Sequence, residues 1–156
     1  DTLIEKHSNE EMVAILAHEV GHYKKHHIKI GLLISILHTG ILFLLLSLFI
    51  DNPRLFEAFK MEQISIYAGF TFFMILYSPI ELVISVFMNA LSRRNEFQAD
   101  SYSAVTTKHP EDLIKGLKNL SVSNLGNLTP HPLSVLLDHS HPPILNRIAA
   151  LRKISA

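Results

Sequence analysis

The sequence predicts an all-α, integral membrane protein, and three observations carry this prediction. Charged residues make up only 18% of the 156 positions, whereas the hydrophobic fraction of 48% is ordinary for a globular protein. Two long stretches contain almost no charge, as membrane-spanning helices do. Elsewhere apolar residues recur at helical spacing, and no segment shows the alternation that is typical of a half-buried strand.

Composition also excludes several classes of function. Lys and Arg number 14 against 14 Asp and Glu, so the formal charge is zero, and no basic run suits the backbone of a nucleic acid. The absence of cysteine excludes disulfide scaffolds, thiolate metal sites and thiol nucleophiles. Ten histidines remain to be explained. Because the sequence starts at Asp1 without the order of a signal peptide, we expect it to be a piece of a longer chain.

Two apolar stretches predict the membrane spans. Residues 30–50 lack Lys, Arg, Asp and Glu, and a helix of this length crosses a hydrocarbon core of about 30 Å. The second span is expected at about residues 64–86, within an apolar stretch that continues to position 92. As one helix, 64–92 would be about 43 Å long, which predicts either a bend near Pro79 or a long extension beyond the membrane. A buried amphipathic helix is the alternative for each stretch.

The charges beside the spans predict an orientation. Five positive residues flank the hairpin and two lie in the loop between the spans: Lys24, Lys25, Lys29, Arg93 and Arg94 against Arg54 and Lys60. Positive residues favour the cytoplasmic side, in a bacterial inner membrane or the endoplasmic reticulum membrane. A hairpin returns the chain to its starting side, so the segments before residue 29 and after residue 92 can meet.

Helices are also predicted outside the spans. Ser-x-x-Glu at 8–11 is a capping box and predicts a helix over about 9–27. Pro110 opens a second amphipathic helix, and 124–132, rich in Asn, Gly, Thr and Pro, is expected to be a loop. The prolines at 142–143 open a last helix.

The first of these helices carries the sequence His18-Glu19-Val-Gly-His22. Residues four apart share a helix face, so both imidazoles can bind one metal ion while Glu19 takes a proton from metal-bound water. This is the HExxH pattern of zinc proteases. The alternative is a pair of surface histidines on an amphipathic helix.

Catalytic zinc needs a third protein ligand. A metzincin would have histidine at position 28, where this chain has Ile28. His26 continues the histidine stripe, but it lies about 12 Å along the helix axis from His18, too far to share one ion. The remaining candidates are carboxylates.

Glu96 and Asp100 are the best carboxylate candidates. They lie four apart on one helix face, and the hairpin returns them to the side of the histidines. One can bind the metal while the other accepts the free N–H of a ligand histidine. An exposed acidic face opposite Arg93 and Arg94 is the alternative, and Glu81 is a weaker candidate ligand near the membrane.

Three separated segments, AHEVGHYKKHH, LSRRNEFQAD and HSHPPILNRIAAL, resemble the membrane-embedded zinc metalloproteases of the type I CAAX prenyl protease family. The resemblance spans nearly the whole chain. It implies that His18, His22 and Glu96 hold one zinc ion per chain and that Glu19 is the general base. It also implies one catalytic region over 1–156 within a longer membrane protein.

The resemblance assigns roles to three further residues. Asp100 would support a ligand histidine, and Arg147 matches an arginine just outside the ligand set. His141 would stabilise the reacting carbonyl. From the residues alone, His-Pro-Pro is also simply a helix start, and His139 competes with His141.

No catalytic role is expected for the other histidines. We expect His26 and His27 to be solvated or interfacial, and His38 to make a polar contact between helices. His7, His109 and His131 flank loops or caps.

The expected function is zinc-dependent peptide hydrolysis in a lipid bilayer, with no nucleic-acid partner. The substrate is a polypeptide, and a prenylated C-terminal tail is one candidate. A heat-shock-type membrane quality-control protease is an alternative. A non-enzymatic, zinc-stabilised membrane scaffold is another, although Glu19 counts against it because a structural zinc site needs no base.

Overall fold

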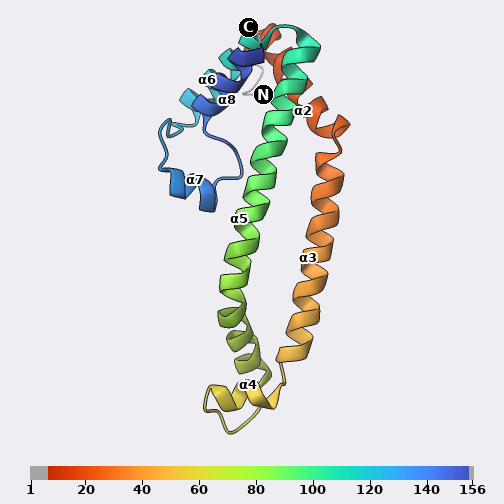
Figure 1. The fold of residues 1–156 in the computed structure, drawn as a ribbon, viewed down its shortest axis with the longest axis vertical. Helices are drawn as coiled ribbons and strands as arrows, with labels where there is room; N and C mark the ends of the chain where they lie inside the picture. The colour runs from red at the N-terminus through yellow and green to blue at the C-terminus, as the bar shows by residue number, and fades with distance from the viewer. Residues whose placement is uncertain (1–6, 155–156) are drawn as a thin grey trace. The chain divides into compact units, whose positions relative to one another are not determined.

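The computed structural model describes residues 7–154, and every regular element in that range is a helix. The prediction of one region over 1–156 therefore includes eight terminal residues that lie outside the described part. The helices are α2 (Asn9–Lys24), α3 (His27–Phe49), α4 (Pro53–Ala58), α5 (Ile66–Thr107), α6 (Pro110–Ser123), α7 (Pro132–Asp138) and α8 (Ile144–Ile154), labelled in Figure 1. The all-α prediction is confirmed.

The chain divides into two compact units. The first, here called the site unit, comprises Asp1–Ile28 and Ser85–Ala156, and the second, the hairpin unit, comprises Lys29–Ile84. Helix α5 begins in the hairpin unit and ends in the site unit. Its helical structure continues through Pro79 as far as Thr107.

Helix α2 begins with the N-cap half of the predicted capping box, whereas the Glu11 carboxylate is hydrogen-bonded to His7 and Asn119. Ser8 Oγ accepts a hydrogen bond from the Glu11 amide, at 3.3 Å, and α2 starts at the next residue. The predicted C-terminal end of this helix was wrong, because α2 ends at Lys24. His26 has a φ of 59°, a left-handed conformation that interrupts the helix before α3 begins at His27.

The core of the site unit is formed by α2, α5, α6 and α8, with α6 packed against both α2 and α8. The buried apolar side chains are Ala14, Ala104, Leu113, Ile114, Leu117, Ile148 and Leu151. Ser103 Oγ donates a hydrogen bond of 2.7 Å to the Ala14 carbonyl and ties α5 to α2 within this core. The core therefore fixes the two helices that carry the HExxH motif and Glu96.

In the hairpin unit, α3 and the first part of α5 run side by side and are connected through α4 (Figure 1). His38 Nε2 lies 2.8 Å from the Tyr77 hydroxyl and 3.1 Å from Glu81 Oε2, which confirms the polar contact expected for His38. Both long helices are long and apolar enough to cross a membrane by length and composition. Glu81 thus lies beside His38 and does not belong to the group of candidate ligands.

Two of the described helices were not predicted from the sequence: α4, which lies in the loop between the two spans, and α7. Residues 124–131 form the expected loop, but α7 starts at Pro132, with His131 as its N-cap. The last helix starts at Ile144, directly after the two prolines, as expected.

Candidate active site

Three predicted ligand atoms converge between α2 and α5. His18 Nε2 and His22 Nε2 are 3.1 Å apart, and the two Glu96 carboxylate oxygens lie 3.6 Å and 3.5 Å from them. Bonds of about 2.0–2.1 Å to tetrahedral zinc place neighbouring donor atoms about 3.3 Å apart. The two nitrogens are close to this separation, and one Glu96 oxygen lies within 4.8 Å of both, so the three side chains could hold a zinc ion. His18, His22 and Glu96 form the group of side chains within residues 7–154 that could hold a metal ion.

Local structure explains why these atoms meet. The i, i+4 spacing places both imidazoles on one face of α2, and α5 supplies Glu96 from the facing side. Gly21 lies at the point of closest approach, since a Cβ there would stand 3.1 Å from both Ala99 Cα and Tyr102 Cβ. A larger residue at this position would push α2 away from α5 and separate the ligands.

A buried ionic network lies behind the ligand cluster. Asp100 Oδ1 is 2.9 Å from His18 Nδ1. Arg147 donates two hydrogen bonds to Asp100, of 2.8 Å and 2.6 Å, and its third nitrogen lies 3.0 Å from Glu96 Oε2. Burial opposes ionisation of Asp100, but the hydrogen bonds from Arg147 and His18 prevail and lower the pKa of this carboxyl. Asp100 is therefore a carboxylate that lies beside His18.

His22 is held in the form that binds metal. Burial, together with the neighbouring His18, lowers the pKa of His22, and this favours the neutral imidazole. Only a deprotonated nitrogen can act as a ligand.

A cavity of about 720 Å³ in the site unit brings the predicted residues together. It is lined by His18, Glu19, His22, Glu96, His139, His141 and Arg147, among others. His141 is 68% exposed, with its Nδ1 atom 3.1 Å from Glu96 Oε1. His139 also lines the cavity, so the structure keeps both histidines of the HSHPP segment beside the ligands.

One expectation about the histidines was wrong. His27 is buried, with 8% of its surface exposed, because the left-handed turn at His26 directs the first residue of α3 inward. Its Nδ1 atom lies 3.2 Å from His22 Nδ1, and its Nε2 atom lies 3.0 Å from Gln98 Oε1. His26 is exposed, as expected.

Arg93 has a role that the sequence did not indicate. The sequence analysis treated it as a flanking charge and as a partner of an acidic face, but it donates hydrogen bonds to the carbonyls of Val135 and His139, at 2.9 Å and 2.6 Å. Asn89 donates a further bond of 2.6 Å to the Leu137 carbonyl. These bonds attach α7 and the start of the HSHPP segment to α5. Bonds to backbone carbonyls leave no side-chain pattern, so no sequence signal could have revealed them.

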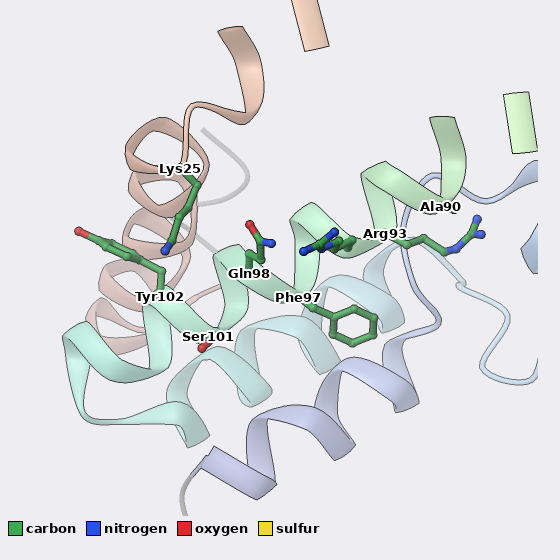
Figure 2. A pocket seen from close by; sticks show the side chains of 8 residues that line it. Lys25, Ala90, Arg93, Phe97, Gln98, Ser101 and Tyr102 are labelled. Atoms are coloured by element: carbon green, nitrogen blue, oxygen red, sulfur yellow. The ribbon is translucent and has the colours of Figure 1, made fainter. Parts of the chain in front are cut away.

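A second hollow, of about 540 Å³, lies on another part of the site unit (Figure 2). It is lined by Lys25, Ala90, Arg93, Arg94, Phe97, Gln98, Ser101 and Tyr102. The lining contains three cations and no acidic residue.

Comparison with known proteins identifies the family. The model of peptidase family M48 matches residues 1–155. The chain belongs to peptidase family M48. M48 peptidases are zinc-dependent, in agreement with the donor set described above. The resemblance to the CAAX prenyl proteases is thereby confirmed at the level of the family.

M48 relatives match almost the entire chain. It is 31% identical to CAAX prenyl protease 1 of Saccharomyces cerevisiae, over 99% of this chain and 37% of the yeast protein. It is 36% identical to the human CAAX prenyl protease 1 homolog, over 92% of this chain and 30% of the human protein. The crystal structure of S. mikatae Ste24p superposes with a TM-score of 0.81 at 32% identity, covering 97% of this chain and 37% of that one. The M48 chain thus spans about a third of the relatives it matches.

Proposed function

We propose that this chain is the catalytic part of a zinc-dependent membrane endopeptidase that cleaves polypeptides carrying a prenylated C-terminal CAAX tail. The observation that carries the proposal is the convergence of His18 Nε2, His22 Nε2 and a Glu96 oxygen, with Glu19 on the same cavity. The M48 relatives named CAAX prenyl proteases support the choice of substrate.

The roles follow from the positions of the side chains. His18, His22 and Glu96 would hold one zinc ion, which when bound polarises the scissile carbonyl and lowers the pKa of water towards about 7. Glu19 takes the proton from the attacking water and delivers it to the leaving amine.

Three other residues assist. His141 donates a hydrogen bond to the oxygen that gains negative charge on the substrate. Asp100 Oδ1 lies 2.9 Å from His18 Nδ1, where it would accept the hydrogen on that nitrogen and so fix the imidazole. Arg147 balances the two buried carboxylates that it contacts, Asp100 and Glu96.

The proposed setting is a bacterial inner membrane or the endoplasmic reticulum membrane, crossed by parts of α3 and α5. The excess of positive residues at the outer flanks supports an orientation with the metal site towards the cytoplasm. The lipid bilayer is then the second partner beside the polypeptide substrate, and no nucleic acid is involved.

The decisive experiment assays the full-length protein against a farnesylated peptide and its unprenylated twin, with and without a zinc chelator. We expect cleavage of the farnesylated peptide that the chelator abolishes. Equal cleavage of both peptides and of unfolded membrane proteins would instead indicate a quality-control protease. No cleavage by the zinc-loaded protein would indicate a scaffold.

Two variants separate the roles within the site. Glu19→Gln should retain zinc and lose about 10²–10⁴-fold in the rate of cleavage. Glu96→Ala should lose zinc, as measured by metal analysis of the purified protein. Wild-type cleavage by Glu19→Gln, or unchanged zinc content in Glu96→Ala, would overturn the corresponding assignment.

A further inference from the structure

A chain of polar contacts leads from His22 away from the ligand cluster. The Nδ1 atoms of His22 and His27 are 3.2 Å apart, and the two rings meet edge to face, with centroids 5.0 Å apart. On the other side of the His27 ring, Nε2 is 3.0 Å from Gln98 Oε1. His27 is buried and lies at the start of α3, while Gln98 lies on α5, two residues after Glu96.

The chemistry of these atoms allows one arrangement of protons. A His22 ring that uses Nε2 as a ligand carries its hydrogen on Nδ1 and needs an acceptor there. His27 provides that acceptor only when its own Nδ1 is unprotonated, which places the His27 hydrogen on Nε2. That hydrogen is then donated to the amide oxygen of Gln98, which can only accept. Both hydrogen bonds therefore require the same tautomer of His27.

We propose that His27, held in one tautomer by Gln98, is a positioning residue that fixes the orientation of His22 as a ligand. It does for His22 what Asp100 does for His18. The inference rests on the proposed function, because it presumes that His22 Nε2 binds zinc.

The two ligand histidines are supported by partners of different charge. Asp100 is a carboxylate that accepts two hydrogen bonds from Arg147, whereas the partner of His27 is the uncharged amide of Gln98. Gln98 also lines the hollow of Figure 2, whose charged members are all cations. An uncharged acceptor at position 98 thus supports His22 without placing a third carboxylate beside Glu96 and Asp100.

Two substitutions at position 27 separate orientation of His22 from simple packing. The side-chain oxygen of Asn can occupy the place of imidazole Nδ1, so His27→Asn keeps an acceptor for His22 and loses the contact with Gln98. The side-chain nitrogen of Gln can occupy the place of Nε2, so His27→Gln keeps the contact with Gln98 and loses the acceptor for His22. If His27 served only to hold α3 against α5 through Gln98, His27→Asn would weaken zinc binding more than His27→Gln, because His27→Asn loses the contact with Gln98.

The test measures zinc affinity of the full-length, detergent-purified protein by competition with a chromophoric chelator. We expect His27→Gln to weaken zinc binding about 10–100-fold and His27→Asn to weaken it less. Gln98→Leu, which frees His27 to change tautomer, should also weaken binding. The visible spectrum of the cobalt-substituted protein should change in His27→Gln, because the ligand field reports the orientation of His22.

His26→Asn is the matched control. The neighbouring side chain is exposed, and asparagine tolerates its left-handed backbone, so zinc affinity should equal that of the wild type. Unchanged affinity in His27→Gln, or a greater loss in His27→Asn than in His27→Gln, would overturn the positioning role. His22→Ala tests the premise separately. If this variant binds zinc like the wild type, the proposed metal site is wrong. If it loses zinc, the metal site stands, and a negative result at position 27 overturns only the role of His27.

Discussion

The site unit and the hairpin unit place their apolar side chains in opposite ways. In the site unit, five Leu and Ile side chains of α6 and α8 are at most 7% exposed and share a common core: Leu113, Ile114, Leu117, Ile148 and Leu151. Along α3 in the hairpin unit, Leu, Ile and Phe side chains point outward, and most are more than half exposed. One unit is organised around an interior, and the other has an apolar exterior suited to lipid. The small fraction of charged residues in this chain is therefore a property of the hairpin unit rather than of the site unit.

The largest effect should come from the buried charges of the site unit. Arg147→Met leaves the carboxylates of Asp100 and Glu96 without their cation, which should destabilise the zinc-free protein by about 3–5 kcal/mol. The measurement is chemical denaturation in detergent. Lys153→Met, on an exposed position of the same helix, is the control and should leave the midpoint almost unchanged. Equal midpoints for the two variants would show that the network adds no stability.

The second prediction compares the loss of stability when a leucine is replaced by alanine in each unit. Leu151 is 0% exposed in the core, so Leu151→Ala should cost about 2–5 kcal/mol. Leu37, on α3, is 57% exposed, and Leu37→Ala should change stability by no more than about 0.5 kcal/mol. Both are measured by unfolding of the full-length protein. A large cost at Leu37 would mean that this face of α3 packs against protein rather than lipid.

The sequence predicted the structure correctly wherever a local pattern of neighbouring residues was sufficient to determine it. Apolar length predicted α3, the capping box predicted the start of α2, and the i, i+4 rule predicted that His18 and His22 share a face. Burial of His27 was not predictable, because two adjacent histidines are alike until the backbone turn at His26 distinguishes them. Tertiary contacts that end on backbone atoms were equally hidden, as the bonds from Arg93 show.

A pH titration distinguishes the charged network from the apolar core. Because Asp100 has a lowered pKa in the folded protein, its stabilising contribution is complete above the ordinary value of 3.8 and is lost as the pH falls through the folded value. The stability gap between wild-type and Asp100→Asn proteins, measured without zinc, should therefore narrow below about pH 4. The gap between wild-type and Leu151→Ala proteins should stay nearly constant. A gap for Asp100→Asn that does not change with pH would contradict an ionised Asp100.

The smallest effect is expected at the polar contact inside the hairpin unit. His38→Leu removes the hydrogen bond with Tyr77 and the contact with Glu81, yet it should cost only about 0.6 kcal/mol. The reason is that in a bilayer the separated helices find other polar partners, so the bond is exchanged rather than lost. A double-mutant cycle with Tyr77→Phe measures the coupling directly. A coupling energy as large as the destabilisation in Arg147→Met would mean that His38 is as shielded from other polar partners as the buried charges of the site unit. The two units would then differ only in the exposure of their apolar side chains.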